Sequence, residues 1–229
     1  TPNYHQAMNG PDADGYYRAM SDEMEQMELK DPWEVVPLAS VPEGANILDS
    51  TWAFKRKRYP DGRVRKLKAR FCVRGDQQIE GVDFFDTYAP VVGWSTVRLL
   101  LILSVILGLA TKQVDYTLAF VHADIDSEVY VRMPKLFEKP GHVYKLKKSV
   151  YGLRQAPLNF FLCLKDGLEA RGFVQSKYDP CLFVSDKVVC LCYVDDCLFF
   201  SRSEEDIDEV IGSLRRPEPM KFDLNIEED

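Results

Sequence analysis

The sequence predicts an α+β fold, in which helices and antiparallel strands share a core without regular β-α-β repeats. Two helical patterns, at residues 95–110 and 157–173, separate groups of short strands instead of alternating with single strands. A turn tetrapeptide, YPDG at 59–62, joins two strand-like runs in the manner of an antiparallel hairpin. A second hairpin is predicted in the apolar run VVCLCYVDDCLFF, residues 188–200, which holds two adjacent acids.

Length and composition place the chain among globular proteins. Its 229 residues, 46% hydrophobic and 28% charged, suffice for one large domain or two lobes with a sizeable core. The first residue is Thr and the end is abruptly acidic, so we expect a fragment of a longer polypeptide. We expect no signal peptide and no membrane association, because the longest apolar run is shorter than the roughly 20 residues of a span.

The six cysteines and three histidines do not suggest a metal centre. No Cys-x-x-Cys pair is present, the histidines are scattered, and Cys190 and Cys192 fit small buried strand residues better than ligands. We therefore expect no structural zinc and favour a reducing compartment.

The charge distribution predicts a local anion-binding surface. The net charge of −7 taken alone argues against nucleic acid. Residues 55–74, however, hold ten Lys or Arg and one acid, whereas residues 1–50 hold ten acids and two bases. Phosphate binding depends on the local field, so the basic hairpin is a candidate nucleic-acid surface.

The first hundred residues predict an arm, a helix, the basic hairpin and a loop. Polar residues with Gly and Pro predict an extended arm over residues 1–20, and a Met-rich apolar stripe predicts an amphipathic helix at 16–30. The hairpin arms flank residues 59–62, and an aromatic loop follows at 81–92. Ser95 or Thr96 is expected to cap the next helix.

That helix, residues 95–110, carries apolar residues around most of its surface and is expected to be the central core helix. Strands are predicted near 111–121, 127–134 and 142–153, and a helix at 157–173. Short strands then surround the acidic pair, and Ser203 is expected to cap a final helix.

Asp195 and Asp196 are predicted at a hairpin tip. A solvated turn explains the pair as well as a function does, since Asp is common in turns. The functional hypothesis is a Mg²⁺ site, because Mg²⁺ takes one or two protein carboxylates and fills its shell with water and phosphate oxygens. Asp115, at the end of a predicted strand, is the best third carboxylate, and Asp124 and Asp126 are alternatives in a polar loop.

Ordered sequence blocks give a resemblance to a known family. Five segments are similar to signature blocks of the reverse transcriptases of copia-type LTR retrotransposons. They are residues 19–36, 68–92, 113–134, 145–157 and YVDD at 193–196. The similarity covers residues 8–229, nearly the whole chain. It implies one right-hand polymerase domain over residues 1–229, with the thumb largely absent.

The resemblance also implies the subdomain limits. Fingers would comprise residues 21–90 and 124–157, palm residues 91–123 and 158–229, and the arm residues 1–20. The expected location is the cytoplasm, within a virus-like particle, or the nucleus.

The resemblance further implies roles for individual residues. Asp115, Asp195 and Asp196 would be catalytic and bind two Mg²⁺ ions, or Mn²⁺, for nucleotidyl transfer to a primer 3′-hydroxyl. Phe120 would be a steric gate against a 2′-hydroxyl, with a core Phe as the alternative. Expected contacts with the nucleotide are Arg56, Lys57, Lys68, Tyr151, Gly152 and Gln155, and expected contacts with nucleic acid are Lys55, Arg70 and Arg74.

The implied partners are an RNA or DNA template with primer, dNTPs, and the ribonuclease H and integrase domains of the same polyprotein. The chain departs from the family pattern after Phe120 and after Pro157, where Leu158 to Phe161 replace a basic residue and Trp-Tyr. An inactive relic or a nucleic-acid-binding module with the same fold is therefore an alternative, and another two-metal nucleotidyl transferase is a weaker one.

Overall fold

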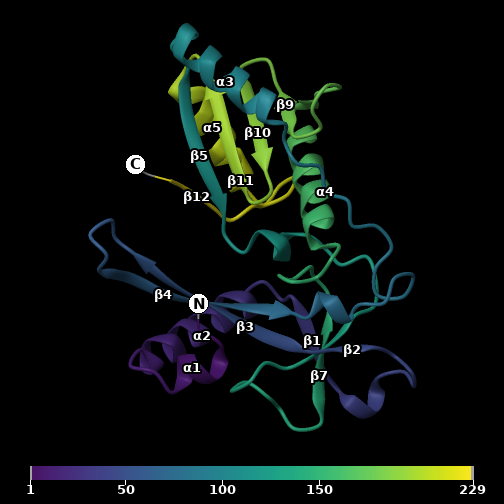
Figure 1. The fold of residues 1–229 in the computed structure, drawn as a ribbon. Helices are drawn as coiled ribbons and strands as arrows, with labels where there is room; N and C mark the ends of the chain where they lie inside the picture. Colours follow the sequence, from purple (N-terminus) through teal and green to yellow (C-terminus); the bar gives the residue numbers. More distant parts are fainter. Residues whose placement is uncertain (1, 228–229) are drawn as a thin grey trace. The chain divides into compact units, whose positions relative to one another are not determined.

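A computed structural model describes residues 2–227 (Figure 1). The chain forms two compact units, one from Thr1–Thr87 and Ala123–Ala156 and the other from Tyr88–His122 and Pro157–Asp229. Each unit is therefore built from two separate stretches of chain. Among the described residues, no helix has the length and apolar content that a membrane span requires.

The first unit combines two helices with two small sheets. Its helices and 3-10 turns are α1 (Tyr4–Met8), α2 (Ala13–Glu28), η1 (Leu38–Ser40) and η2 (Gly75–Gln77). Its strands are β1 (Trp33–Pro37), β2 (Ile47–Leu48), β3 (Ser50–Arg58), β4 (Val64–Val73), β6 (Tyr130–Arg132) and β7 (His142–Leu146). One sheet has the order β1-β7-β6-β2, in which β2 and β6 are parallel, and the antiparallel pair β3-β4 is the predicted basic hairpin.

Aromatic residues join these sheets in the core of the first unit. Trp33 of β1 stacks on Tyr144 of β7 with ring centroids 4.3 Å apart, and Phe71 of β4 packs edge-on against Trp33 at 5.5 Å. Tyr16 of α2 contacts Phe54 of β3 edge-on at 4.9 Å. The base of the basic hairpin is therefore anchored in a packed core.

The prediction of an extended arm over residues 1–20 is wrong. Asn3 and Gln6 form a reciprocal capping box that starts α1, and α2 begins at Ala13. The buried face of α2 starts at Tyr16 and continues with Met20, Met24 and Met27. This apolar stripe crosses the expected boundary, and its burial outweighs the Gly and Pro content that suggested an arm.

The second unit contains one antiparallel sheet of six strands. The strands are β5 (Ala110–Tyr116), β8 (Val174–Gln175), β9 (Leu182–Val184), β10 (Val188–Tyr193), β11 (Asp196–Ser201) and β12 (Leu224–Ile226). Their order is β12-β5-β11-β10-β9-β8, and every pair is antiparallel. The helices are α3 (Trp94–Leu107), η3 (Ala119–His122), α4 (Ala156–Glu169) and α5 (Glu204–Leu214).

Helices α4 and α5 cover one face of this sheet (Figure 1). Phe160 of α4 packs edge-on against Tyr116 of β5 at 5.5 Å. Lys112 of β5 forms ion pairs with Glu204 and Asp208 of α5, at 2.9 and 2.5 Å. Because alternate strand residues point to opposite faces, Asp115 lies on the face that these helices do not cover.

Helix α3 corrects the expectation of a central core helix. Only Ser104 is buried in it, and several large apolar side chains are exposed: Trp94, Leu99, Leu101, Ile102, Val105, Ile106 and Leu107. A helix that is apolar all round carries no directional signal, so its sequence could not show which stripe meets the sheet. Its N-cap is Gly93, not Ser95 or Thr96, and the Asp179 carboxylate accepts from the Gly93 amide at 3.0 Å and the Thr96 hydroxyl at 2.6 Å.

Two glycines allow close backbone packing in the first unit. Gly152 has a φ of +96°, and a Cβ there would lie 2.1 Å from the Val73 carbonyl oxygen. A Cβ on Gly75 would lie 2.0 Å from the Gly152 carbonyl oxygen. The Val73 amide donates to the Tyr151 carbonyl at 2.8 Å, which fixes the segment against the end of β4. Only glycine fits both positions without backbone movement.

Gly152→Ala is expected to lower the free energy of unfolding by at least about 1–3 kcal/mol, through a strained φ and a backbone clash. Gly212→Ala in α5 is the control, since open space surrounds that position, and it should gain about 0.5–1 kcal/mol. Urea unfolding followed by circular dichroism measures both. Equal stability of Gly152→Ala and the parent chain would show that the contact is not tight.

Candidate active site

The acidic pair lies at the tip of an antiparallel hairpin, as the sequence predicts. Strands β10 and β11 pair from Val188↔Ser201 to Tyr193↔Asp196, which leaves Val194 and Asp195 as the turn. Val194 has a φ of +57°, a conformation that a β-branched residue rarely adopts. The strands below the turn are largely buried. The fold therefore holds the acids on a rigid element and accepts local backbone strain to do so.

The structure brings Asp115 together with the pair. Asp196 is the direct cross-strand partner of Asp115, so both side chains leave the same face of the sheet. The Tyr116 amide donates to the Asp195 carbonyl oxygen at 3.2 Å, which joins the turn to the end of β5. Three carboxylates from two distant stretches of chain thus gather at one end of the sheet.

The alternative acids lie in the other unit. Asp124 forms an ion pair with Lys148 at 2.6 Å, and Asp126 lies near Ser127 and Gln155. The contacts of Asp124 and Asp126 are thus those of structural polar residues within the first unit.

The site has an unfavourable concentration of negative charge. Burial, the charge of Asp195 and the charges of Asp115 and Glu227 together raise the pKa of Asp196, while a hydrogen bond from Gln113 acts in the opposite direction. Carboxylates this close repel one another unless one of them is protonated or a cation lies between them. Oxygen ligands at a shared site are the donor set that a hard divalent cation prefers.

Sequence reasoning missed two neighbours of the acids. Gln113 stands two residues before Asp115, so strand periodicity alone could have placed it on the same face. Glu227 follows β12, which was not predicted because its residues lie in an acidic segment without an apolar pattern. Asn225 of β12 pairs with Asp115, so this strand supports the second side of β5.

A mainly apolar cavity of about 230 Å³ opens beside Asp196 within the second unit. It is lined by Val92, Trp94, Val97, Gln113, Leu191, Tyr193, Asp196 and Leu198. The carboxylate thus stands at the edge of an apolar surface, as in small-molecule sites that combine apolar walls with a few polar groups.

Phe120 lies in η3, just after β5. Its side chain is 8% exposed, and its ring packs edge-on against Phe160 at 6.2 Å. The ring is held by the core yet is not completely covered. Both earlier interpretations, a steric gate and a core residue, stay open on this geometry.

Tyr116 lies behind the acids, on the face covered by the helices. Its side chain is 2% exposed, and its buried hydroxyl lies against the Cys197 thiol. Burial, followed by the nearby thiols of Cys197, Cys190 and Cys192, raises the pKa of Tyr116 well above its usual range. The tyrosine is therefore neutral at physiological pH.

The basic hairpin places like charges opposite one another. Lys55 pairs directly with Lys68, and Lys57 with Lys66, so four ammonium groups share one face of β3-β4. Directly opposed like charges destabilise a sheet. Such an arrangement is typical of a surface that binds an anion.

Several predicted contacts in the first unit have protein partners, and the half-buried Glu23 carboxyl lies near Lys68 and Arg70. Arg56 on the opposite face forms an ion pair with Asp12. Arg70 lies over the Tyr151 ring at 4.0 Å. Arg74 donates twice to Asp76, at 2.7 Å each, and this pair raises the pKa of Arg74 and lowers that of Asp76.

Gln155 is completely buried in a polar network. Its amide nitrogen donates to the Asp83 carbonyl oxygen at 2.8 Å, and its oxygen accepts from Gln78 at 2.9 Å. Gln78 also accepts from the Arg154 amide at 2.8 Å. These bonds fix the segment after Gly152, a role that the sequence did not reveal.

Comparison with known proteins identifies the family of the chain. A family model described as reverse transcriptase (RNA-dependent DNA polymerase) matches residues 31–226. The chain is 31% identical to the retrovirus-related Pol polyprotein from transposon TNT 1-94 of Nicotiana tabacum, over 94% of the chain and 17% of that protein.

Two further relatives come from a plant and a yeast. The retrovirus-related Pol polyprotein from transposon RE2 of Arabidopsis thaliana is 32% identical over 94% of the chain and 15% of its own length. The transposon Ty1-H Gag-Pol polyprotein of Saccharomyces cerevisiae is 30% identical over 88% and 11%. The chain thus spans 11–17% of these relatives. It belongs to the reverse transcriptase family, and the resemblance to copia-type Pol polyproteins is confirmed.

Proposed function

We propose that this chain is the fingers and palm part of an RNA-directed DNA polymerase, and that the three aspartates are its catalytic carboxylates. The observation that carries the proposal is the pairing of Asp196 with Asp115 beneath a turn that holds Asp195. Family membership sets the reaction class. The first unit would correspond to fingers and the second to palm.

The residues fit divalent ions. Asp196 has a raised pKa because neighbouring carboxylates and burial disfavour its charge. Asp115, Asp195 and Asp196 offer the hard oxygen donors that Mg²⁺ or Mn²⁺ prefers. Two such ions, when bound, would activate the primer 3′-hydroxyl and neutralise charge on the leaving pyrophosphate.

The chain's own residues would position the catalytic acids and exclude a 2′-hydroxyl from the nucleotide site. The sheet holds Asp115 and Asp196 in register, so the acids need little rearrangement when substrate binds. The Gln113 hydrogen bond orients the Asp196 carboxylate. Phe120 would exclude a 2′-hydroxyl from the nucleotide site.

The lysine face of β3-β4 is proposed to bind phosphates of the dNTP or the template. Lys55, Lys57, Lys66 and Lys68 repel one another across the hairpin, and an anion would remove that repulsion. Lys66 is added here to the residues expected from sequence. Arg70, Arg74, Tyr151, Gly152 and Gln155 are proposed to shape this region through the contacts described above.

Asp195→Asn and Asp115→Asn are expected to lower primer extension by at least about 10²–10³-fold, because each removes charge that would hold the reacting ions. Poly(rA)·oligo(dT) with Mg²⁺ or Mn²⁺ is the assay. Asp186→Asn, an exposed acid in the turn before β10, is the matched control. Full incorporation by Asp195→Asn would place the reaction elsewhere, and no incorporation by the parent chain would favour the inactive relic.

Asp196→Asn should raise the free energy of unfolding in EDTA by about 0.5–2 kcal/mol, since it removes a charge that its neighbours and burial oppose. Addition of Mg²⁺ should narrow this difference by stabilising the parent chain. Asp186→Asn should stay within about 0.5 kcal/mol of the parent. Urea titrations with and without Mg²⁺ measure the effect, and destabilisation of Asp196→Asn in EDTA would contradict the electrostatic account.

Phe120→Val tests the steric gate. The smaller side chain should raise the ratio of rNTP to dNTP incorporation by about 10- to 200-fold. Phe160→Leu controls for lost packing, because it alters the neighbouring ring without changing the proposed gate. An unchanged ratio with reduced stability would assign Phe120 to the core.

A further inference from the structure

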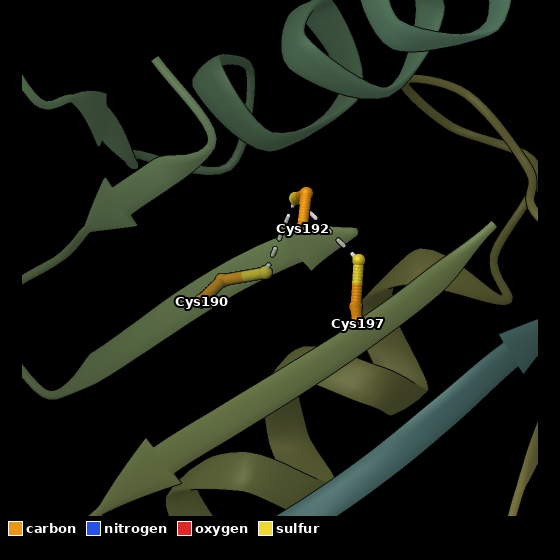
Figure 2. Close-up of side chains that lie close together, drawn as sticks. All are labelled: Cys190, Cys192 and Cys197. Carbon is orange, nitrogen blue, oxygen red and sulfur yellow. Dashed lines mark hydrogen bonds between the residues drawn. The ribbon is translucent and has the colours of Figure 1, made fainter. Parts of the chain in front are cut away.

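Three cysteine thiols meet directly behind the acidic turn (Figure 2). Cys190 and Cys192 come from β10, and Cys197 comes from β11. The Sγ atoms of Cys190 and Cys192 are 3.8 Å apart, and those of Cys192 and Cys197 are 3.5 Å apart. All three sulfurs lie within 4.8 Å of one another. The strands thus hold three soft donors in one small triangle.

Strand register explains this cluster. Cys190 and Cys192 share a face because they are two residues apart, and Cys192 is the cross-strand partner of Cys197. This is the face opposite Asp196, and the three side chains are at most 2% exposed. The cluster therefore lies in the core. Cys192 directly precedes the turn segment Tyr193–Asp196, and Cys197 directly follows it.

Tyr116 adds an oxygen to the same place. It shares a face with Val114, the cross-strand partner of Cys197, and the three thiols are its electrostatic neighbours. Its hydroxyl is buried and interacts directly with the Cys197 thiol. A buried hydroxyl beside three thiols is an oxygen donor within reach of the same cluster.

The triangle has the dimensions of a zinc site. A Zn–S bond of about 2.3 Å in a tetrahedral shell places two sulfurs about 3.8 Å apart. The two measured separations, 3.8 and 3.5 Å, match this spacing. Thiolate sulfur selects Zn²⁺ or Cu⁺ over hard cations. With three thiolates, Zn²⁺ leaves one net negative charge in the core, whereas Cu⁺ would leave two. Zn²⁺ also takes a fourth donor.

We propose that Cys190, Cys192 and Cys197 bind a Zn²⁺ ion, with the Tyr116 hydroxyl oxygen as the fourth donor. Three S–H bonds break, their protons pass to solvent, and three Zn–S bonds form, which leaves one net negative charge. No electron is transferred. The ion would join β10 to β11 on the covered face, while the aspartates occupy the opposite face.

This site is separate from the proposed polymerase chemistry. Its ligands are sulfur donors on the buried face, and the carboxylates would bind hard cations on the other face. Its effect would be structural, because a zinc ion across β10 and β11 would fix the register that positions Asp195 and Asp196. Failure of zinc binding would leave the polymerase proposal untouched, and the reverse also holds.

The test uses the full chain refolded from urea with a non-thiol reductant, since a buried site is loaded most readily as the chain folds. Cd²⁺ serves as the spectroscopic probe, because Cd–thiolate bonds absorb in the ultraviolet. We expect absorption that saturates at one Cd²⁺ per chain, competition by Zn²⁺, and a higher thermal unfolding midpoint with either ion. No saturable absorption and no midpoint shift in the parent chain would overturn the proposal.

Variants assign the ligands. Cys192→Ser should lose Cd²⁺ affinity by at least about tenfold, whereas Cys163→Ser on α4 should bind as the parent does. Cys190→Ala and Cys197→Ala are parallel arms in case a buried serine prevents folding, and any folded variant that keeps parental affinity contradicts the site.

The fourth donor has its own comparison. Tyr116→Phe should weaken Cd²⁺ or Zn²⁺ binding, and Cys181→Ser should not. If Cys181→Ser weakens binding and Tyr116→Phe does not, the fourth ligand is Cys181 and not Tyr116. The Cys181 carbonyl oxygen accepts the Cys192 amide at 2.8 Å.

Discussion

The cross-strand register between β5 and β11 is the constraint on which the site depends. Asp196 meets Asp115 only because Cys197 meets Val114 and Leu198 meets Gln113 on the strands below. A slip of one residue would send the carboxylates into the core and the buried residues into solvent. The burial of Val114, Cys197 and Phe199 thus fixes a polar arrangement on the opposite face. The free energy gained by burial on one face of the sheet therefore offsets the repulsion between the carboxylates on the other face.

Sequence patterns identified the local elements of this site well and its distant partners less well. Alternation, turn residues and family blocks were enough to place the acidic hairpin, the basic hairpin and Asp115. Gln155 was expected to contact the nucleotide, and its buried bonds to Gln78 and Asp83 could not be predicted because these partners lie more than seventy residues away. β12 was missed because three residues beside an acidic tail carry no periodic signal.

The errors share a physical cause, which is that burial depends on tertiary neighbours. Helix α3 is apolar around most of its surface, yet Ser104 is its only buried residue. The segment before residue 20 looked irregular, yet the core of the first unit accepts Tyr16 and orders α2. The sequence also did not show that Cys197 lies beside Cys192, because only the pairing of β10 with β11 brings them together.

The interleaving of the two units has a consequence for synthesis of the chain. β5 lies between β11 and β12, and β12 leaves the ribosome roughly a hundred residues after β5, a delay of about 5–20 s at common elongation rates. Both edges of β5 lack their strand partners until β11 emerges, and one edge stays exposed until β12 emerges. Exposed edges invite pairing with other chains. The segment that carries Asp115 is therefore open to mispairing during synthesis until its partner strands emerge.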